Sequence, residues 1–359
     1  MTPVELSRTV LRAVRRAVDE GELSVVVPER ASVTVPGAGG CGDYATNIAL
    51  QLARPAGETP RRVAELLLPH LAGAQGVSGV EITGPGFLNI SLGSTASTSL
   101  VAEILRRGPR YGFVDGPAGG DDTPSAPTAH LVRLHAPHEP RALVVMDVVA
   151  RLLRSQGADV RTSCEAGPPE SVWATVLGVD AYCAPQELSP SDIEVRPVPV
   201  PTPDLAPLLT LGRDAARWAL LHPAAHDRPR VTADHLVQRE ANPLFRVRYA
   251  YARTRAVSRN AADLGFTARP GDVRAEVTPL LADHPRVLSR AAAHRAPDLL
   301  ARHLVAVADA ALVLLPAVLP LGDEKPLAAH RARLALAEAA GAVLAGGLSL
   351  LGIDAPEHL

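Results

Sequence analysis

Apolar residues recur at helical spacing along most of the chain, and the helices that they predict form two groups. In the N-terminal third, helices are expected near residues 3–19, 44–54, 60–75 and 96–106. Two alternating runs, Val80–Ile82 and Leu88–Leu92, predict strands joined by a turn at Gly84-Pro85-Gly86. From residue 204 onward only helical patterns follow, at 204–222, 232–262, 285–294, 298–319 and 326–351. The pattern indicates a small α/β domain followed by an all-α bundle.

A shorter strand–helix–strand pattern lies between these two groups. His130 to Leu134 is expected to form a first strand, residues 141–155 a helix and residues 157–162 a second strand. A run rich in Gly, Pro and Asp precedes this pattern and is expected to be a mobile linker. The expected organisation is an N-terminal α/β domain, a linker, an α/β segment and a helical bundle, at 1–106, 107–127, 128–203 and 204–359.

Composition narrows the class of protein without naming a function. The 359 residues carry a formal net charge of −2, so any basic segment is a local patch. The three cysteines are far apart and form no CxxC pair, which indicates neither a disulfide framework nor a metal site. Because the N-terminus shows no apolar signal region and the composition fits a GC-rich genome, we expect a cytoplasmic bacterial protein. The apolar run from Leu304 to Leu321 contains Asp309 and two prolines, so we interpret it as a core helix rather than a membrane span.

Residues 242–260 form the most basic stretch of the chain, with five arginines, three aromatic residues and no acidic residue. Arg248, Arg255 and Arg259 are expected on one helix stripe, with Arg246 and Arg253 on a neighbouring one. Guanidinium groups match phosphate geometry and aromatic faces stack on unpaired bases, so this stretch predicts a nucleic-acid surface. The alternative is the solvated basic face of an ordinary amphipathic helix.

The basic stretch and its surroundings resemble the anticodon-binding domain of arginyl-tRNA synthetases. Asn242-Pro243 and then Tyr249-Ala250-Tyr251-Ala252-Arg253 are similar to the entry of that domain. Asp214-Ala215-Ala216-Arg217 is similar to the Asp-Ala-Leu-Arg (DALR) signature, and Leu351-Gly352-Ile353 with Ala355-Pro356 resembles the C-terminal ending of the family. The family usually closes on Arg-Met, whereas this chain has His358 and Leu359.

The N-terminal part resembles the other end of the same family. Residues 42–49 and 84–90 are similar to the bacterial N-terminal domain, which touches the elbow of the tRNA. The resemblance implies that Phe87 would offer a stacking ring and Asn89 an amide to an unpaired base. Packing of Phe87 in the core beside the turn is the open alternative. Asp43 is expected to be the N-cap of the helix that follows it.

The middle of the chain departs from the family. The class I catalytic domain consists of two βαβαβ halves, which need well over 100 residues at roughly 30 residues per βαβ unit. Only the stretch from Thr128 to Pro207 separates the two recognisable ends. That stretch is too short for a complete catalytic domain, and we interpret it as a degenerate Rossmann-like remnant.

The nucleotide signature of the family survives in part. In the HAPH segment, His135 and His138 correspond to the two imidazoles that the resemblance places on the ATP phosphates. Pro137 stands where the family has the glycine that lets the adenine approach the backbone, and it adds a ring while removing an N–H. Glu139 and Pro140 then place an acidic group and a missing donor at a helix N-terminus that should face phosphate.

The second catalytic signature of the family, a Lys-Met-Ser-Lys-Ser loop, has no counterpart in this sequence. Residues 195–211, where it should lie, are proline-rich and apolar. The chain contains one lysine, Lys325, which lies far downstream of the remnant. The catalytic residues of the family are therefore expected to be eroded.

These observations predict a non-catalytic relative of arginyl-tRNA synthetases that binds tRNA through both ends. The expected partner is an arginine-type tRNA, with a partner enzyme as a further candidate, and we expect a monomer without contact to a membrane. No cofactor is expected; ATP would be a ligand only for the alternative, a residual arginine–tRNA ligase that uses His135 and His138. A tRNA-dependent accessory protein and a protein-binding scaffold also remain open. The tRNA-binding candidates are Phe87, Asn89, Arg246, Arg248, Tyr249, Arg253, Arg255 and Arg259.

Overall fold

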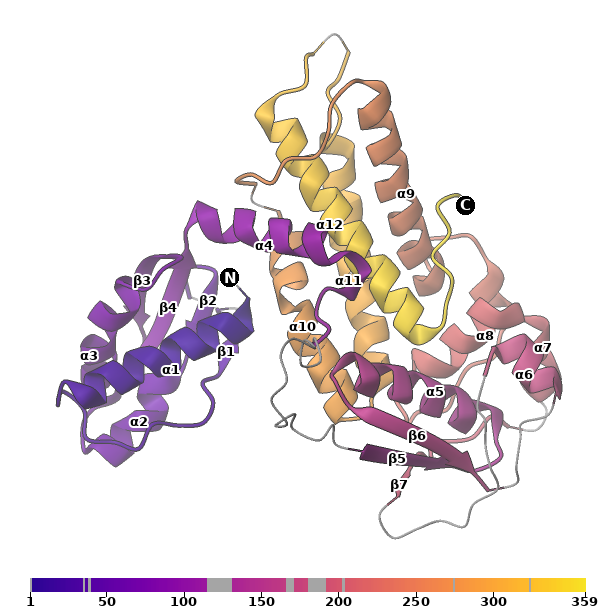
Figure 1. Ribbon diagram of the computed structural model, residues 1–359, viewed down its shortest axis with the longest axis horizontal. Coiled ribbons are helices and arrows are strands. Elements are labelled where there is room, and N and C mark those ends of the chain that lie inside the picture. The colour runs from indigo at the N-terminus through magenta and orange to yellow at the C-terminus, as the bar shows by residue number, and fades with distance from the viewer. Residues whose placement is uncertain are drawn as a thin grey trace, which may run out of the picture. The chain divides into compact units, whose positions relative to one another are not determined.

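The computed structural model describes residues 2–34, 36–37, 40–114, 131–165, 171–179, 192–201, 204–273, 275–322 and 324–359. The chain divides into two compact units. The first consists of Met1–Glu103, Arg269–Arg274 and Leu327–Leu336, and the second of Ile104–Ala268, Ala275–Pro326 and Ala337–Leu359. Figure 1 shows the sheets and helices of both, and the expected fold class, α/β plus all-α, is confirmed.

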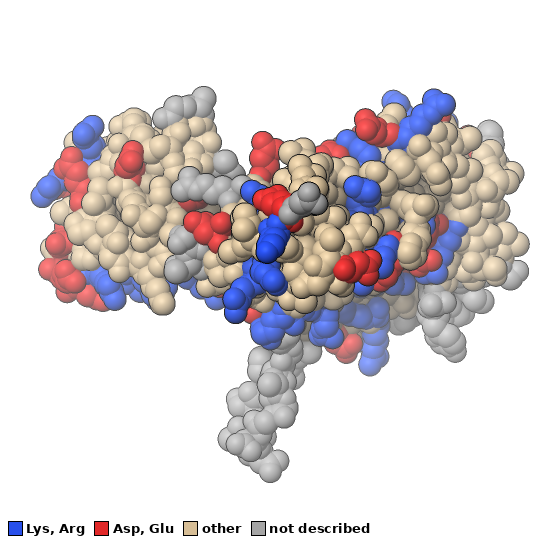
Figure 2. All heavy atoms as spheres, turned by 90° about the horizontal axis from the view of Figure 1, so that it is seen from above, with Lys and Arg blue, Asp and Glu red and all other residues tan. Residues whose placement is uncertain are grey.

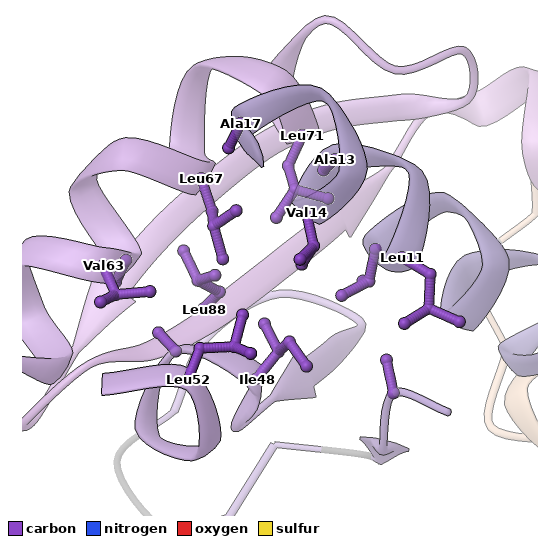
Figure 3. Close-up of a cluster of buried hydrophobic side chains, with 14 of the residues drawn as sticks. Leu11, Ala13, Val14, Ala17, Ile48, Leu52, Val63, Leu67, Leu71 and Leu88 are labelled. Atoms are coloured by element: carbon purple, nitrogen blue, oxygen red, sulfur yellow. The ribbon is translucent and has the colours of Figure 1, made fainter. Parts of the chain in front are cut away.

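The first unit is built on a four-stranded antiparallel sheet with the strand order β1-β2-β4-β3. Three helices pack against this sheet, and a fourth, α4, follows it. Figure 3 shows apolar side chains of the three packed helices meeting Leu88 in one core. The elements are α1 (Pro3–Asp19), β1 (Val33–Thr34), β2 (Tyr44–Thr46), α2 (Ile48–Ala56), α3 (Pro60–Ala72), β3 (Val77–Thr83), β4 (Phe87–Leu92) and α4 (Ser94–Arg107).

Local sequence explains where α1 begins. Thr2 is its N-cap and accepts a hydrogen bond from the Glu5 backbone N–H, while the Glu5 carboxylate accepts one from the Thr2 N–H. This reciprocal capping box satisfies two donors that a helix start leaves free. Leu6, Val10 and Val14 then recur at helical spacing and are fully buried against the sheet.

The prediction of a helix at 44–54 is wrong at its start. Tyr44–Thr46 instead forms β2, which pairs antiparallel with β4, and α2 begins only at Ile48. Asp43 does not cap this helix, because its carboxylate accepts the Leu92 backbone N–H at 2.7 Å. Pairing with the central strand therefore outweighs the helical pattern of the residues that follow.

The expected turn at Gly84-Pro85-Gly86 is confirmed as the loop of the β3–β4 hairpin. Gly86 adopts a φ of +141°, and a Cβ there would lie 2.7 Å from the Pro60 carbonyl oxygen. Both the backbone conformation and the close approach of α3 require glycine at this position. The hairpin fixes where Phe87 and Asn89 stand on β4.

The second unit combines a small parallel sheet with a helical bundle. The sheet has the order β6-β5-β7, and α5 packs between it and the bundle helices α8 and α10. The strand–helix–strand pattern expected at 130–162 is thus confirmed. The elements are η1 (Gly108–Arg110), β5 (Leu131–Ala136), α5 (Pro140–Ser155), β6 (Asp159–Cys164), α6 (Ser171–Leu177), β7 (Ile193–Glu194), α7 (Leu205–Thr210), α8 (Gly212–Leu221), η3 (Ala233–Leu236), α9 (Pro243–Asp263), α10 (Val277–Ala293), α11 (Pro297–Leu314), η4 (Leu315–Ala317) and α12 (Ala328–Leu351).

Several bundle helices differ from their expected limits. The helix expected at 204–222 is divided into α7 and α8 at Gly212, whose φ is +72°. The helix expected from 232 begins at Pro243, and the one expected from 285 begins earlier, at Val277, and continues through Pro285. Proline is a good first residue of a helix, which explains why α9 begins at Pro243 and why a start was wrongly expected at Pro285.

The expected linker at 107–127 is structured in its first part. Gly108–Arg110 forms η1, and Tyr111 is buried against His284, with ring centroids 6.0 Å apart. The Val114 backbone N–H donates to the Ser155 carbonyl at 2.9 Å. The remainder of the expected linker, from residue 115 onward, lies outside the described residues, and the domain boundaries stay predictions.

Two described helical segments, Pro297–Ala317 and Ala328–Leu351, are long and apolar enough to span a membrane by length and composition. They belong to α11 and α12, and 50% and 78% of their most apolar windows are buried within the molecule. Core helices of folded bundles share this character. The interpretation of the Leu304–Leu321 run as a core helix agrees with this burial.

A fully buried arginine of α8 joins α5, α6 and α12. Arg217 of α8 donates to the carbonyl oxygens of Leu351 and Leu177, each at 2.8 Å, and to the Asp147 carboxylate of α5 at 2.5 Å. The side chain is 0% exposed. Gly352 lies against the same guanidinium, since a Cβ there would come within 2.5 Å of it. Three segments far apart in sequence therefore meet at one charge.

Replacing Arg217 by Met should destabilise the second unit strongly. The change leaves the partly buried Asp147 carboxylate and the two carbonyls without this donor, which should lower the free energy of unfolding by about 3–5 kcal/mol. Both tryptophans of the chain, Trp173 and Trp218, lie in the second unit, so urea unfolding followed by their fluorescence reports on that unit. The exposed Arg213→Met on the same helix should change stability by only about 0.5 kcal/mol; equal losses for both variants would contradict this account.

Two buried histidines stack in the bundle. His284 of α10 and His303 of α11 have ring centroids 5.3 Å apart, and Tyr111 also stacks on His284. Burial, with His303 as a lesser cause, holds the pKa of His284 well below its ordinary value. Burial also lowers the pKa of His303 to about 4. Both imidazoles are therefore neutral in the folded protein near neutral pH.

This pair predicts that the second unit loses stability in mild acid. A histidine with a depressed folded pKa contributes full stability above its unfolded pKa of about 6.5, and that contribution is lost as the pH falls toward the folded value. For His303 the difference corresponds to about 3 kcal/mol between pH 7.5 and pH 4. Urea unfolding at several pH values should show this decline. His303→Gln should reduce the slope relative to the wild type; an identical slope would show that His303 does not cause the decline.

Candidate nucleic-acid interface

The basic stretch folds into a single helix, α9, with one buried face. Asn242 caps it by accepting the Leu244 backbone N–H, and its amide also donates to the carbonyls of His235 and Val237, which hold η3 beside the helix start. Pro243 occupies the first turn. The apolar face packs on α11, and its buried residues are Leu244, Val247, Ala250, Val257 and Ala261.

Two of the five arginines are held by aspartates of neighbouring helices. The Arg246 guanidinium lies 2.9 Å from the Asp309 carboxylate of α11. The Arg248 guanidinium lies 3.5 Å from the Asp214 carboxylate of α8, which also accepts the Asp354 backbone N–H. Burial raises the pKa of Asp214, while that backbone N–H and Arg248 act in the opposite direction. These arginines join α9 to the rest of the bundle, and their contact with RNA stays a prediction.

The other three arginines are more open to solvent. Arg253 is exposed and forms no ion pair within the described residues. Arg255 and Arg259 are about 40% exposed and share one carboxylate, that of Glu357. On the face seen in Figure 2, basic and acidic side chains are interspersed, as the net charge of −2 leads one to expect. The cationic character of α9 is thus local.

The aromatic residues of α9 differ in exposure. Tyr249 is 38% exposed and its ring stacks on Phe245, with centroids 5.5 Å apart and an interplanar angle of 17°. Tyr251 is half-buried, and burial raises the pKa of its hydroxyl. Tyr249 is therefore the better placed of the two to stack on a base.

A pocket of about 340 Å³ opens beside the first turns of α9. It lies between the start of α8, η3, α9 and the C-terminal segment, and both apolar and charged groups line it. Its walls include Asp214, His235, Gln238, Phe245, Arg248 and Asp354. Sequence reasoning missed this pocket, because its walls come from four segments that are brought together only by folding.

The two candidates in the first unit lie two residues apart on β4 and differ in exposure. Phe87 is 39% exposed, so the alternative of core packing is not what the structure shows. Asn89 is 2% exposed and its amide donates to the Thr83 hydroxyl at 2.6 Å. The Asn89 amide is thus engaged inside the hairpin, while Phe87 is available to a ligand. The roles of both in RNA binding stay predictions.

Sequence reasoning also overlooked a basic stripe on α1. Arg8, Arg12 and Arg15 follow the i, i+4, i+7 spacing and are exposed. The signal was visible in the sequence, because three arginines at helical spacing share one face. This stripe is the most basic helix surface that the first unit offers in the described part of the chain.

The HAPH segment, in which the sequence predicts a remnant of the nucleotide signature, is packed against other parts of the same chain. His135 is 2% exposed and its Nδ1 lies 2.9 Å from the Ser163 hydroxyl, while the His138 ring lies against Trp173 at 5.0 Å. The Glu139 carboxylate caps α5: one oxygen accepts the Ala142 N–H and the other accepts the Val200 N–H.

Arg141 completes this packing. Its side chain is 0% exposed and donates only to backbone carbonyls. The acceptors are the carbonyls of Val198, Leu220, Pro223, Ala224 and Asp227. Desolvation lowers the pKa of this guanidinium. The first turn of α5 is therefore packed against residues 198–200 and 220–227.

Two family models match the two ends of the chain. The arginyl-tRNA synthetase N-terminal domain matches residues 5–92, and the DALR anticodon-binding domain matches residues 247–359. The chain is an arginyl-tRNA synthetase-like protein. This confirms the resemblance drawn from the motifs, and it places most of α9 inside the DALR domain.

Curated relatives of this arginyl-tRNA synthetase-like protein are arginine–tRNA ligases. The one from Paenarthrobacter aurescens is 26% identical over 554 aligned positions, with 100% of both chains covered. Since this chain has 359 residues, at least 195 of the 554 positions have no residue here. The ligase from Renibacterium salmoninarum is 42% identical over 167 residues, which cover 45% of this chain and 30% of the relative.

Solved structures show the same fold at low identity. The arginyl-tRNA synthetase of Thermus thermophilus has a TM-score of 0.65 and 14% identity, with 100% of both chains covered. The enzyme of Plasmodium falciparum has a TM-score of 0.70 and 10% identity, with 99% of both chains covered. At this identity the comparison shows the fold alone.

The exposures on α9 predict different roles for its two tyrosines. Tyr249→Ala should weaken tRNA binding by about 1–3 kcal/mol, because the exposed ring can no longer stack on a base. The melting temperature should stay nearly unchanged, because the ring is not part of the core. Tyr251→Ala is the matched control: it should lower the melting temperature more and the affinity less. Fluorescence anisotropy with labelled tRNA and thermal unfolding measure both quantities. A Tyr249→Ala protein with wild-type affinity would contradict the stacking role.

Proposed function

We propose that this protein is a non-catalytic arginyl-tRNA synthetase paralogue that binds tRNA through its N-terminal and anticodon-binding domains. The observation that carries the proposal is the start of α5, which is filled by the side chains of Glu139 and Arg141. The two family domains supply the expectation of tRNA as partner.

The chemistry of a phosphate site explains why the filled helix start matters. A helix N-terminus binds phosphate through free N–H groups and its positive dipole end. Here Pro140 has no N–H, the Ala142 N–H is bound to Glu139, and a carboxylate stands where the anion would approach. The buried Arg141 is committed to five carbonyls and offers no charge to a nucleotide. These contacts support a structural role for this segment.

The length of the chain supports the same proposal. At least 195 alignment positions of the Paenarthrobacter aurescens ligase have no counterpart here. The sequence also lacks the second catalytic signature, and its single lysine is Lys325. We propose that an arginine-type tRNA is bound in the cytoplasm of a bacterium by a monomer that needs no cofactor. A role as a tRNA-dependent accessory protein for a partner enzyme fits this proposal.

The competing function is a residual arginine–tRNA ligase. It is favoured by the alignment over the full length of a ligase and by the retained imidazoles of His135 and His138. In that case ATP would bind at the remnant. His135 is nearly inaccessible, and His138 packs on Trp173, which weighs against this alternative.

Arginine-dependent exchange between ATP and pyrophosphate should be indistinguishable from a control without enzyme, because the phosphate site at α5 is filled. The same preparation should bind tRNA in a filter or anisotropy assay. A clear exchange signal that disappears in His138→Ala but persists in His226→Ala, whose imidazole is exposed, would establish the ligase instead. Absence of tRNA binding would overturn the proposed function.

A further inference from the structure

The C-terminal segment runs back along α9 after α12 ends. Gly352, with a φ of +68°, terminates α12, and Ile353 is buried. The Asp354 backbone N–H donates to the Asp214 carboxylate at 3.2 Å, which fixes the direction of the segment. Residues 353–359 form neither helix nor strand. The segment is thereby placed so that Glu357 reaches the second half of α9.

Glu357 bridges two arginines with its two oxygens. Oε1 accepts from Arg255 Nε at 3.1 Å, and Oε2 lies 3.4 Å from Arg259 Nη1. The arginines are one helical turn apart, so both guanidiniums face the same side of α9. An anion held between two guanidiniums is also the arrangement in which arginines bind a phosphate group.

This carboxylate differs from those that hold the other arginines. Asp309 and Asp214 belong to packed helices, and their arginines are only 29% and 26% exposed. Glu357 lies on an irregular segment, and all three partners of its cluster are between 40% and 47% exposed. Exposed ion pairs contribute little net stability, so this one exchanges at low cost.

We propose that Arg255 and Arg259 form a single phosphate-binding site, which Glu357 occupies in the free protein and an RNA phosphate takes over on binding. This inference rests on the proposed tRNA-binding function, and it identifies Glu357 as the group that regulates RNA binding at that same surface. Glu357 lowers the affinity of this face for any RNA backbone, so that binding depends on the additional contacts of the correct RNA.

Variants that replace the charged side chains by uncharged glutamine test whether an RNA phosphate displaces Glu357. tRNA affinity is measured by anisotropy for the wild type, Glu357→Gln, Arg255→Gln/Arg259→Gln and the triple variant. Glu357→Gln should bind tRNA about three- to tenfold more tightly, as expected when two weak exposed pairs no longer compete. In the background without the two arginines, the same change should have no effect. Thermal unfolding verifies that each variant is folded.

A matched control separates competition at the two arginines from the effect of removing one negative charge anywhere near α9. Glu240→Gln removes the same charge near the start of α9 from an exposed side chain, and it should leave tRNA affinity unchanged. An equal gain from Glu240→Gln, or a gain from Glu357→Gln that persists without the two arginines, would overturn the proposal. Unchanged affinity in Glu357→Gln would overturn it while leaving the tRNA-binding function intact. No tRNA binding by any variant would overturn both.

Discussion

The second unit depends on the buried guanidinium of Arg217. Its hydrogen bonds join three segments that no local preference would bring together: the end of α6, Asp147 of α5 and the end of α12. Because a charge in the interior is tolerated only with full pairing, each partner must remain where it is. This requirement also directs the C-terminal segment, since Gly352 turns directly against Arg217. The position of Glu357 beside α9 therefore follows from a contact formed elsewhere in the fold.

Arg141 shows the same principle at the start of α5. Its five carbonyl acceptors come from Val198, from the end of α8 and from residues 223–227, and each would otherwise need water or another donor. A guanidinium with five N–H groups meets this need better than any other side chain. The side chain of Arg141 thus holds the first turn of α5 against Val198 and residues 220–227.

Sequence patterns predicted most of the helices, the β3–β4 hairpin and the character of α9, because those features rest on local spacing and on caps such as Asn242. They failed at Tyr44–Thr46, where pairing with β4 decides the structure, and at Pro285, which lies inside a helix rather than at its start. The acids that hold the arginines of α9 could not be predicted. Asp309 is 63 residues from Arg246 and Glu357 is 102 residues from Arg255, so only the fold places them together. The burial of Arg141 and Arg217 was equally invisible, because arginine is usually exposed.

The cationic face of α9 consists of guanidinium groups alone. Such groups keep their charge across the whole physiological pH range, and acetylation, which neutralises lysine, does not act on them. The single lysine, Lys325, lies outside this helix. The positive charge of α9 is thus constant. Only the neighbouring carboxylates change how many of its guanidinium groups are free to bind a ligand. Evolution of affinity on this surface would therefore proceed most readily through the acids of α8, α11 and the C-terminal segment rather than through the arginines.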